Sequence, residues 1–303
     1  MKFIPQFLRL FLPLLLFGIC RKATGQISRP VPLITCYHHD YDEPMAVPPP
    51  DFIFLQTDVP RSNFEFIYTD SVPDYVRDVV EYAARIWESQ LVSPVDIRIQ
   101  VSWEAFDERG VLASAGPTTL YRDFEGALEP EIWYAVALAE SLIGINLNED
   151  DPDINVVINS ETNWYTALDG NTPRNRIDMV SVILHELGHG LGFFASTMSP
   201  GDSTGVIGLD DLPLIYDVFL ENGAGQHLIN PLFFESPSVE LLDELTGNDL
   251  FFDSEAATLL NGGLPQLWAP AEFEEGSSIS HLDERLFPPG NDNALMSPQI
   301  AFG

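Results

Sequence analysis

Two histidines four residues apart, His185 and His189, lie at the end of a strongly apolar stretch. In residues 178–187, DMVSVILHEL, apolar side chains cover most of the surface, which predicts a helix buried in a domain core. Residues at this spacing lie one turn apart on the same helix face, so both imidazoles can reach one metal ion. Glu186 projects beside them and can hold a water molecule without being a ligand itself. The chain must therefore build its core around a helix with a metal-binding face.

Two glycines, Gly190 and Gly192, directly follow this helix. Glycine ends a helix at low steric cost and lets the chain turn sharply. A catalytic zinc site takes a third protein ligand and keeps one position open for water. The compact pattern HExxHxxGxxH would place that ligand at position 195, where the chain has Ala195. The third ligand must therefore come from elsewhere in the sequence.

Three alternatives exist for this third ligand. His281 lies in SISHLDER, well beyond the helix, and is the alternative we favour. His227 lies in GAGQHL, whose glycines are typical of a surface loop. A carboxylate, as in thermolysin-like enzymes, is the third alternative. Asp283, close to His281, either orients a ligand imidazole or, as we favour, is a solvated acidic side chain.

The helix motif with its glycine, the later His281 and Met296 in ALMSP together resemble the metzincin metallopeptidases. The sequence resembles most the leishmanolysin-like branch and its bacterial secreted relatives, in which an insertion separates the helix motif from the third histidine. The resemblance implies that His185, His189 and His281 bind one catalytic zinc ion. It also implies that Glu186 is the general base and that Met296 forms the methionine turn beneath the metal.

Hydrophobic periodicity predicts an α+β fold with a mixed twisted sheet. Alternating side chains predict strands at residues 64–68, 95–103 and 154–158. Helical periodicity predicts helices at residues 72–91 and 130–143, ahead of the helix that carries the histidines. After Gly192 the sequence is rich in Gly, Pro, Asp and Asn, which predicts loops with short helices near residues 212–219 and 254–260.

The resemblance covers the chain from about residue 64 to its end and implies a catalytic domain at residues 61–303. It implies two lobes, at about 61–192 and 193–303, with the zinc helix in the first and a loop-rich second lobe. One edge of the sheet would receive the substrate as an added strand. Metzincin domains usually continue into a helix past the methionine turn, whereas this sequence stops at Gly303. We therefore expect either a truncated domain or packing supplied from elsewhere.

The first 25 residues read as a secretory signal peptide. They combine early basic residues, an apolar run at residues 10–19 that is too short to span a membrane, and a small-residue cleavage site before Gln26. A lipoprotein is not favoured, because Ile19 rather than a small residue precedes Cys20. The expectation is a secreted or extracytoplasmic protein without a membrane span.

Residues 26–60 are punctuated by prolines, which suits an N-terminal extension or pro-segment. Cys36 is the one cysteine left after removal of the signal, so an intramolecular disulfide cannot form. Its setting resembles the cysteine switch of leishmanolysin-like propeptides, in which a thiolate blocks the open zinc position. A merely buried or tolerated thiol is the alternative.

The chain is strongly acidic, with 46 acidic and 14 basic residues and a net charge of -32. Such a charge repels nucleic acid and anionic membranes, and it suits a salty environment that screens the repulsion. Calcium is a second possible cofactor for the acidic run at residues 148–153, although that run lacks the spacing of an EF-hand loop. A solvated acidic loop is the simpler interpretation there.

The function predicted from these residues is a secreted zinc endopeptidase that acts on proteins or peptides by means of activated water. An exported adhesion or binding module with a structural or inactive zinc site is the main alternative. Hydrolysis of a non-peptide amide or ester would use the same metal chemistry. Three histidines with an open position favour catalysis, because structural zinc sites usually close with a fourth protein ligand. The oligomeric state is left open.

Overall fold

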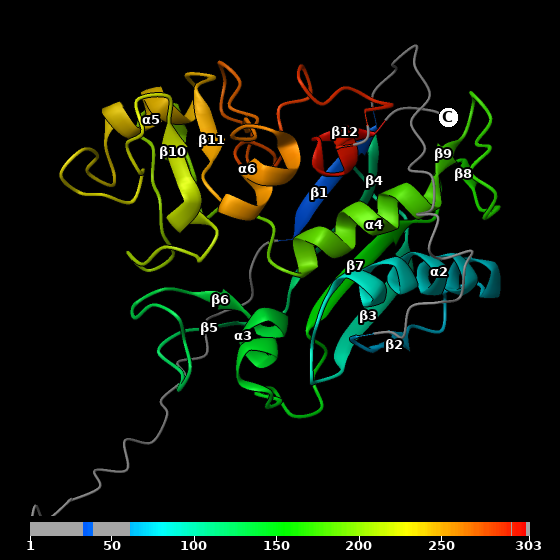
Figure 1. Ribbon diagram of the computed structural model, residues 1–303. Helices are drawn as coiled ribbons and strands as arrows, with labels where there is room; N and C mark the ends of the chain where they lie inside the picture. Colours follow the sequence, from blue (N-terminus) through cyan, green and yellow to red (C-terminus); the bar gives the residue numbers. More distant parts are fainter. Residues whose placement is uncertain (1–32, 39–60, 292, 301–303) are drawn as a thin grey trace, which may run out of the picture.

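The computed structural model describes residues 33–38, 61–291 and 293–300, and it has an α+β architecture with a mixed sheet (Figure 1). The predicted signal peptide therefore lies outside the described residues. The main sheet has six strands. In spatial order these are β12 (Gln299–Ile300), β1 (Ile34–His38), β4 (Val111–Pro117), β7 (Ile154–Asn159), β3 (Ile97–Glu104) and β2 (Phe64–Tyr68).

Strand direction divides this sheet into two parts. Strands β2, β3 and β7 run parallel to one another, whereas β4 is antiparallel to β7 and β1 is antiparallel to β4. Strand β12 runs parallel to β1. The three predicted strands are confirmed as β2, β3 and β7, and the prediction of a mixed sheet is confirmed with them.

Five α-helices occur in the described part of the chain. They are α2 (Asp74–Gln90), α3 (Val136–Ile143), α4 (Met179–Gly190), α5 (Val239–Leu245) and α6 (Glu255–Asn261). Three 3-10 turns cover Pro200–Asp202, Asp217–Phe219 and Ala294–Met296. None of the helices in this part of the molecule is long and apolar enough to cross a membrane.

Two of the predicted helices differ from the structure. Helix α3 begins at Val136 rather than near residue 130, because Tyr134–Ala135 (β6) pairs with Leu120–Tyr121 (β5). The helix predicted at residues 212–219 is wrong: only a single 3-10 turn forms there. The chain then enters β10 (Leu220–Asn222), which pairs with β11 (Leu250–Phe252). A third short pair joins β8 (Trp164–Tyr165) to β9 (Ile177–Asp178).

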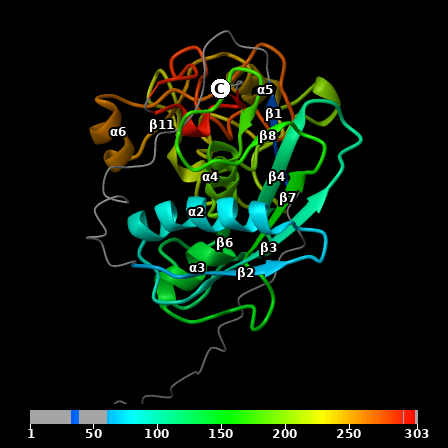
Figure 2. The ribbon, with the colours of Figure 1, turned by 90° about the vertical axis from the view of Figure 1, so that its right-hand side faces the viewer.

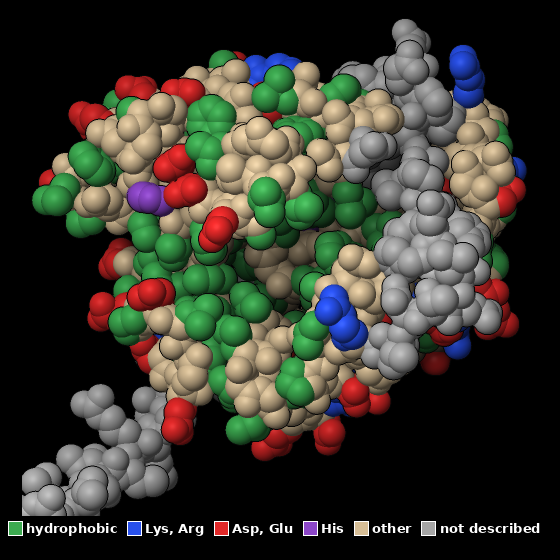
Figure 3. All heavy atoms as spheres, viewed as in Figure 1, with side chains coloured by type: hydrophobic (Ala, Val, Ile, Leu, Met, Phe, Trp, Pro, Cys, Tyr) green, Lys and Arg blue, Asp and Glu red, His purple; other side chains and the backbone are tan. Residues whose placement is uncertain are grey.

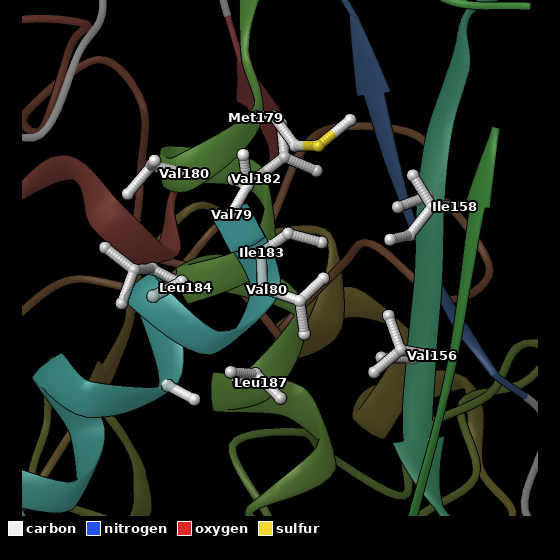
Figure 4. Packing of buried hydrophobic residues seen from close by; sticks show 14 of the residues in the cluster. Val79, Val80, Val156, Ile158, Met179, Val180, Val182, Ile183, Leu184 and Leu187 are labelled. Carbon is white, nitrogen blue, oxygen red and sulfur yellow. The ribbon is translucent and has the colours of Figure 1, made fainter. Parts of the chain in front are cut away.

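Helices α2 and α4 pack together on the sheet, as two views of the ribbon show (Figures 1 and 2). Val79 and Val80 of α2 pack beside Ile183 of α4, and all three belong to the same buried cluster as Val156 and Ile158 of β7 (Figure 4). The indole of Trp87 in α2 donates a hydrogen bond of 3.1 Å to the Leu184 carbonyl. Every residue of α4 is buried, so the sheet and α2 hold the histidine-bearing helix from both sides.

The start of α4 is fixed by a local cap. The Asp178 carboxylate accepts hydrogen bonds from the backbone N–H and the hydroxyl of Ser181, at 2.8 and 2.7 Å. An aspartate in this position satisfies a backbone donor that the first helical turn leaves free. The cap therefore sets the phase of the helix, and with it the direction in which the histidines point.

Strand β1 is the main difference from the expected organisation of the chain. Residues 34–38 belong to the segment expected to form an N-terminal extension, yet they pair with β4 inside the main sheet. Residue 37 also pairs with β12, near the described end of the chain. The sheet thus joins two segments that lie far apart in the sequence.

The acidic run at residues 148–153 is tied to the fold. The buried Asp153 carboxylate accepts hydrogen bonds from the Arg98 backbone N–H and the Asn148 side chain, at 2.8 and 2.7 Å. Asp150, at 3.7 Å from Arg98, forms an ion pair. Elsewhere, acidic side chains are spread widely over the face in Figure 3, whereas Lys and Arg are few there. The carboxylates of Asp150 and Asp153 in this run therefore have partners within the protein.

A buried carboxyl in α3 gives a prediction about pH. Burial raises the pKa of Glu140 to about 7, although its carboxylate accepts a hydrogen bond of 2.6 Å from Leu147 N–H. The folded protein therefore holds this proton more tightly than the unfolded chain, whose value is near 4.5. The protonated Glu140 therefore contributes fully to the free energy of unfolding below pH 4.5, and this contribution is lost as the pH rises through about 7.

The glutamine of Glu140→Gln cannot ionise, so this substitution should make the stability of the protein depend less on pH between about 4.5 and 7. The expected result is a higher Tm than the parent protein at pH 8, with little difference at pH 4, measured by thermal unfolding across that range. Glu125→Gln, at an exposed position, is the matched control. An equal change in Tm at pH 8 in both variants would contradict the burial of Glu140 as the cause of the pH dependence.

Candidate metal centre

The side chains of His185, His189 and His281 converge on one point. Helix α4 presents the first two from adjacent turns, and the loop before residue 282 supplies the third. Their Nε2 atoms lie 3.0, 3.1 and 3.3 Å apart. All three side chains are fully buried. The structure thus brings together the three histidines that the sequence analysis favoured as ligands.

Each imidazole ring is oriented by a hydrogen bond of its Nδ1 nitrogen to a backbone carbonyl. His185 Nδ1 lies 2.7 Å from the Leu295 carbonyl oxygen, and His281 Nδ1 lies 2.8 Å from the Ser277 carbonyl oxygen. His189 Nδ1 lies 2.7 Å from the Phe193 carbonyl oxygen. A carbonyl oxygen only accepts, so in each ring Nδ1–H is the donor and the neutral ring keeps a lone pair on Nε2.

The three Nε2 atoms, each with a lone pair and no hydrogen, cannot form hydrogen bonds with one another. Because each Nε2 is an acceptor, their short separations are unfavourable unless a cation lies between them. Zinc–nitrogen bonds of about 2.0–2.1 Å in a tetrahedral site would separate the nitrogens by roughly 3.3 Å. The observed separations therefore fit a single divalent ion of this size.

The protonation state also suits metal binding. Burial lowers the pKa of His185 to about 4 and that of His281 to about 3. Burial likewise lowers the pKa of His189 well below its usual value, helped by the two neighbouring imidazoles. The rings are therefore neutral at pH 7, which is the form that binds a metal.

Glu186 lies beside these rings with an unsatisfied carboxylate. Both of its carboxyl oxygens are buried, and neither has a hydrogen-bond partner in the described structure. Burial raises the pKa of Glu186 well above its usual range. A buried charge without a partner is costly. The carboxylate is thus suited to a water molecule or a cation rather than to a partner in the protein.

Cys36 lies near this group although it comes from β1. Its Sγ, one ring nitrogen of His185 and one Glu186 carboxyl oxygen all lie within 4.8 Å of one another. The thiol is fully buried, and burial raises its pKa well above the usual value. Both alternatives for Cys36, a buried thiol and a cysteine switch, agree with this position, because the thiol is buried and also lies close to the predicted metal site.

Met296 lies in a turn that contacts the histidine-bearing segments. It ends the 3-10 turn Ala294–Met296, and the preceding carbonyl, of Leu295, orients His185. A Cβ atom added to Gly188 would lie 2.8 Å from Met296 Sδ, so the turn packs directly against α4. The Met296 carbonyl accepts a hydrogen bond of 2.8 Å from Leu282 N–H, next to His281. The turn at Met296 therefore contacts both segments that carry the three histidines.

The turn after α4 completes the site. Gly192 has φ of +117°, which an L side chain rarely adopts, and Phe193 N–H donates back to the Gly188 carbonyl at 3.0 Å. This fold-back brings the Phe193 carbonyl to His189. The three orienting carbonyls are backbone groups, so no side-chain pattern could predict them, although Gly192 signals the turn itself.

The competing candidates have other partners. His227 is partly exposed on the segment after β10, 3.9 Å from an Asp253 oxygen, and it groups with Glu221 rather than with the three histidines. Asp283 neither orients a ligand ring nor lies in solvent. It is buried and holds Arg285 through two contacts of 2.8 and 2.9 Å. Both interpretations of Asp283 from the sequence are therefore wrong.

Close packing between α4 and β7 leads to a prediction for Gly190. A Cβ atom there would lie 2.3 Å from Cγ2 of Ile154, which is fully buried in β7. Gly190→Ala should lower the free energy of unfolding by about 1–3 kcal/mol, because overpacking outweighs the gain in helix propensity. Urea unfolding measures this, with Gly263→Ala, which meets nothing within 4 Å, as the control. Equal stability of the two variants would contradict the tight packing of α4 on β7.

A family model described as SPBPB7E8-like matches residues 139–257. The match runs from α3 to α6, includes the motif HELGH and ends before His281. No curated protein and no solved structure matches the chain.

Proposed function

We propose that the chain is a secreted zinc-dependent endopeptidase of the metzincin type. The observation that carries this proposal is the convergence of three buried Nε2 lone pairs beside an unpartnered carboxylate. His185, His189 and His281 would hold the ion, and the remaining position would be open to water and substrate. The two-lobed metzincin organisation, with residues 193–303 as the second lobe, is part of this proposal.

Zinc supplies Lewis-acid chemistry in such sites: it polarises a carbonyl group and makes water a stronger acid. Glu186 accepts the proton of the attacking water and returns it to the departing amine as the peptide bond breaks. Its carboxylate is available for both transfers, since neither oxygen accepts a hydrogen bond from the described part of the chain. The buried carbonyl partners of the rings keep the ligands in place throughout.

Cys36 adds a latent state to this proposal. The Cys36 thiol lies close to His185 and Glu186, so the Glu186 carboxylate could accept its proton, and the thiolate would then block the open position of the site. Removal of the segment that carries it would then activate the enzyme. In the alternative function, an adhesion or binding module, the same thiol would be a permanent fourth ligand that closes a structural site. The position of Cys36 close to His185 and Glu186 is compatible with both roles.

Cleavage of an unbiased peptide library by the full chain tests the proposal. The zinc-loaded parent protein and Cys36→Ala should be compared with and without a chelator. Chelator-sensitive cleavage that rises in Cys36→Ala is expected for a latent peptidase. Bound zinc with no cleavage in either protein would favour the structural site.

A further inference from the structure

We infer that Glu221, His227 and Asp253 form a second metal site, on the strands β10 and β11, and that it binds a zinc ion. The ligands are one imidazole nitrogen and two carboxylates, with water at the remaining positions of the ion. These residues take no part in the proposed catalysis. The inference therefore goes beyond the proposed function and does not depend on it.

Backbone pairing places the three side chains on one face of a small sheet. Glu221 lies opposite Phe251 in the antiparallel pair of β10 and β11, and on its other side it forms a bridge with His227. Asp253 follows two residues after Phe251, and its N–H continues the ladder with a hydrogen bond of 2.7 Å to the Phe219 carbonyl. Side chains that lie opposite each other, or two residues apart in a strand, share one face of a sheet. The register therefore brings the imidazole and both carboxylates together.

The other face of these strands is apolar and fixes their position. Leu220, Leu228 and Leu250 are at most 1% exposed and belong to a buried cluster that also contains Phe194. Leu228 N–H donates a hydrogen bond of 3.0 Å to the Leu220 carbonyl, which ties the segment that carries His227 to β10. The candidate ligands are thus carried by a backbone that the core holds in place.

The three side chains lie close enough to share one ion. One ring nitrogen of His227 and one carboxyl oxygen each of Glu221 and Asp253 all lie within 4.8 Å of one another. The space-filling view shows acidic side chains beside a histidine over β10 and β11 (Figure 3). Ligand atoms on a tetrahedral zinc ion are roughly 3.3 Å apart, so small side-chain rotations would close the site around the metal.

Partners from the protein do not account for these groups. Glu221 is only 9% exposed, yet its carboxylate accepts no side-chain or backbone hydrogen bond within the described part of the chain. His227 Nδ1 is buried without a partner, and His227 Nε2 lies 3.9 Å from an Asp253 oxygen, too far for a hydrogen bond. A buried charge or polar atom without a partner is costly. A bound cation would satisfy both carboxylates and one ring nitrogen.

The sequence around the group offers little positive charge. Between Arg176 and Arg285 the chain contains no lysine or arginine, and all three candidate ligands lie in this stretch. Two carboxylates so close together repel each other unless a positive charge lies near them. An ion from solvent can supply that charge, because the side chains of His227 and Asp253 are 43% and 44% exposed.

The imidazole decides which ion the site prefers. Calcium and magnesium take oxygen ligands, whereas imidazole suits zinc and other transition ions. Manganese binds such sites more weakly than zinc. Zinc is therefore the expected occupant, with manganese as a weaker competitor.

Zinc titration of the metal-free full chain, followed by calorimetry, tests the inference. The parent protein should bind a second zinc ion besides the one at His185, His189 and His281. Because even an outer-shell change costs a zinc site 10–100-fold, His227→Ala and Glu221→Gln should each weaken the second site at least about tenfold. Glu235→Gln, which makes the same charge change at an exposed position, should not. Unchanged affinity of the second site in His227→Ala would overturn the inference.

Competition with calcium chloride separates a built zinc site from an acidic surface that attracts any cation. In the parent protein calcium should not displace the second zinc ion at equal concentration. His227→Asp replaces the imidazole with a third carboxylate, so it should bind zinc at least about tenfold more weakly and calcium more tightly. Equal affinity of the parent protein for zinc and calcium at this position would overturn the inference.

Crystals of the parent protein grown with zinc give a test that needs no variant. A second anomalous peak within bonding distance of Glu221, His227 and Asp253 is expected. No peak there, with zinc bound at the three histidines, would overturn this inference and leave the proposed peptidase standing. A peak there together with absence of peptide cleavage in all conditions would support the second site and reject the proposed function.

Discussion

Glu186→Gln is expected to lower kcat/KM for peptide hydrolysis by about 10²–10⁴-fold while zinc stays bound. Glutamine keeps the shape of the side chain but cannot accept the proton of the attacking water. Metal binding should be unaffected, because the three imidazoles and their carbonyl partners are unchanged. The activity should be measured on a Cys36→Ala background, so that latency does not hide the difference, and zinc content should be measured on the same samples.

Glu140→Gln is the matched control, since Glu140 is also a buried glutamate but lies in α3. It should keep the parent activity. If Glu186→Gln turned over substrate as fast as Glu140→Gln, Glu186 would not be the general base. If it lost its zinc as well, the carboxylate would be a ligand rather than a proton carrier.

His281→Ala is expected to weaken zinc binding by more than about 100-fold, because the loss of an outer-shell partner alone costs 10–100-fold. The remaining pair on α4 would leave the ion with two protein ligands. Because a bound ion stabilises the folded state, the rise in Tm on addition of zinc should shrink with the affinity. Titration of the metal-free protein with zinc, followed by calorimetry, measures both effects.

His227→Ala is the control for this experiment. His227 is partly exposed, beside Asp253, and is not among the three converging histidines. It should bind zinc at the main site as tightly as the parent protein. The reverse result, with tight binding lost in His227→Ala and kept in His281→Ala, would exchange the two candidates for the third ligand.

The sequence predicted most of what surrounds α4. Alternation in β2, β3 and β7 was visible because each has one more exposed face. Strand β4 was not predicted, since VLASAGP is buried on both faces and its small residues show no alternation. Strand β1 was placed in an extension because prolines dominate its surroundings, whereas its pairing depends on β4, which the sequence did not reveal.

The site was predictable to the extent that side chains define it. The spacing of His185 and His189 fixes their common face, and the resemblance supplied His281, which no local pattern required. What the sequence missed are the carbonyls of Phe193, Ser277 and Leu295, because they are backbone groups from turns. Asp283 was misinterpreted for a related reason: its partner, Arg285, is a neighbour in the same turn.

Anomalous diffraction from crystals of the full chain, collected on either side of the zinc absorption edge, tests the central claim most directly. We predict one strong peak about 2.0–2.1 Å from the Nε2 atoms of His185, His189 and His281. The account would be contradicted by crystals grown with zinc in which the three rings hold no anomalous peak, or in which the ion binds elsewhere and His281 lies apart from the other two.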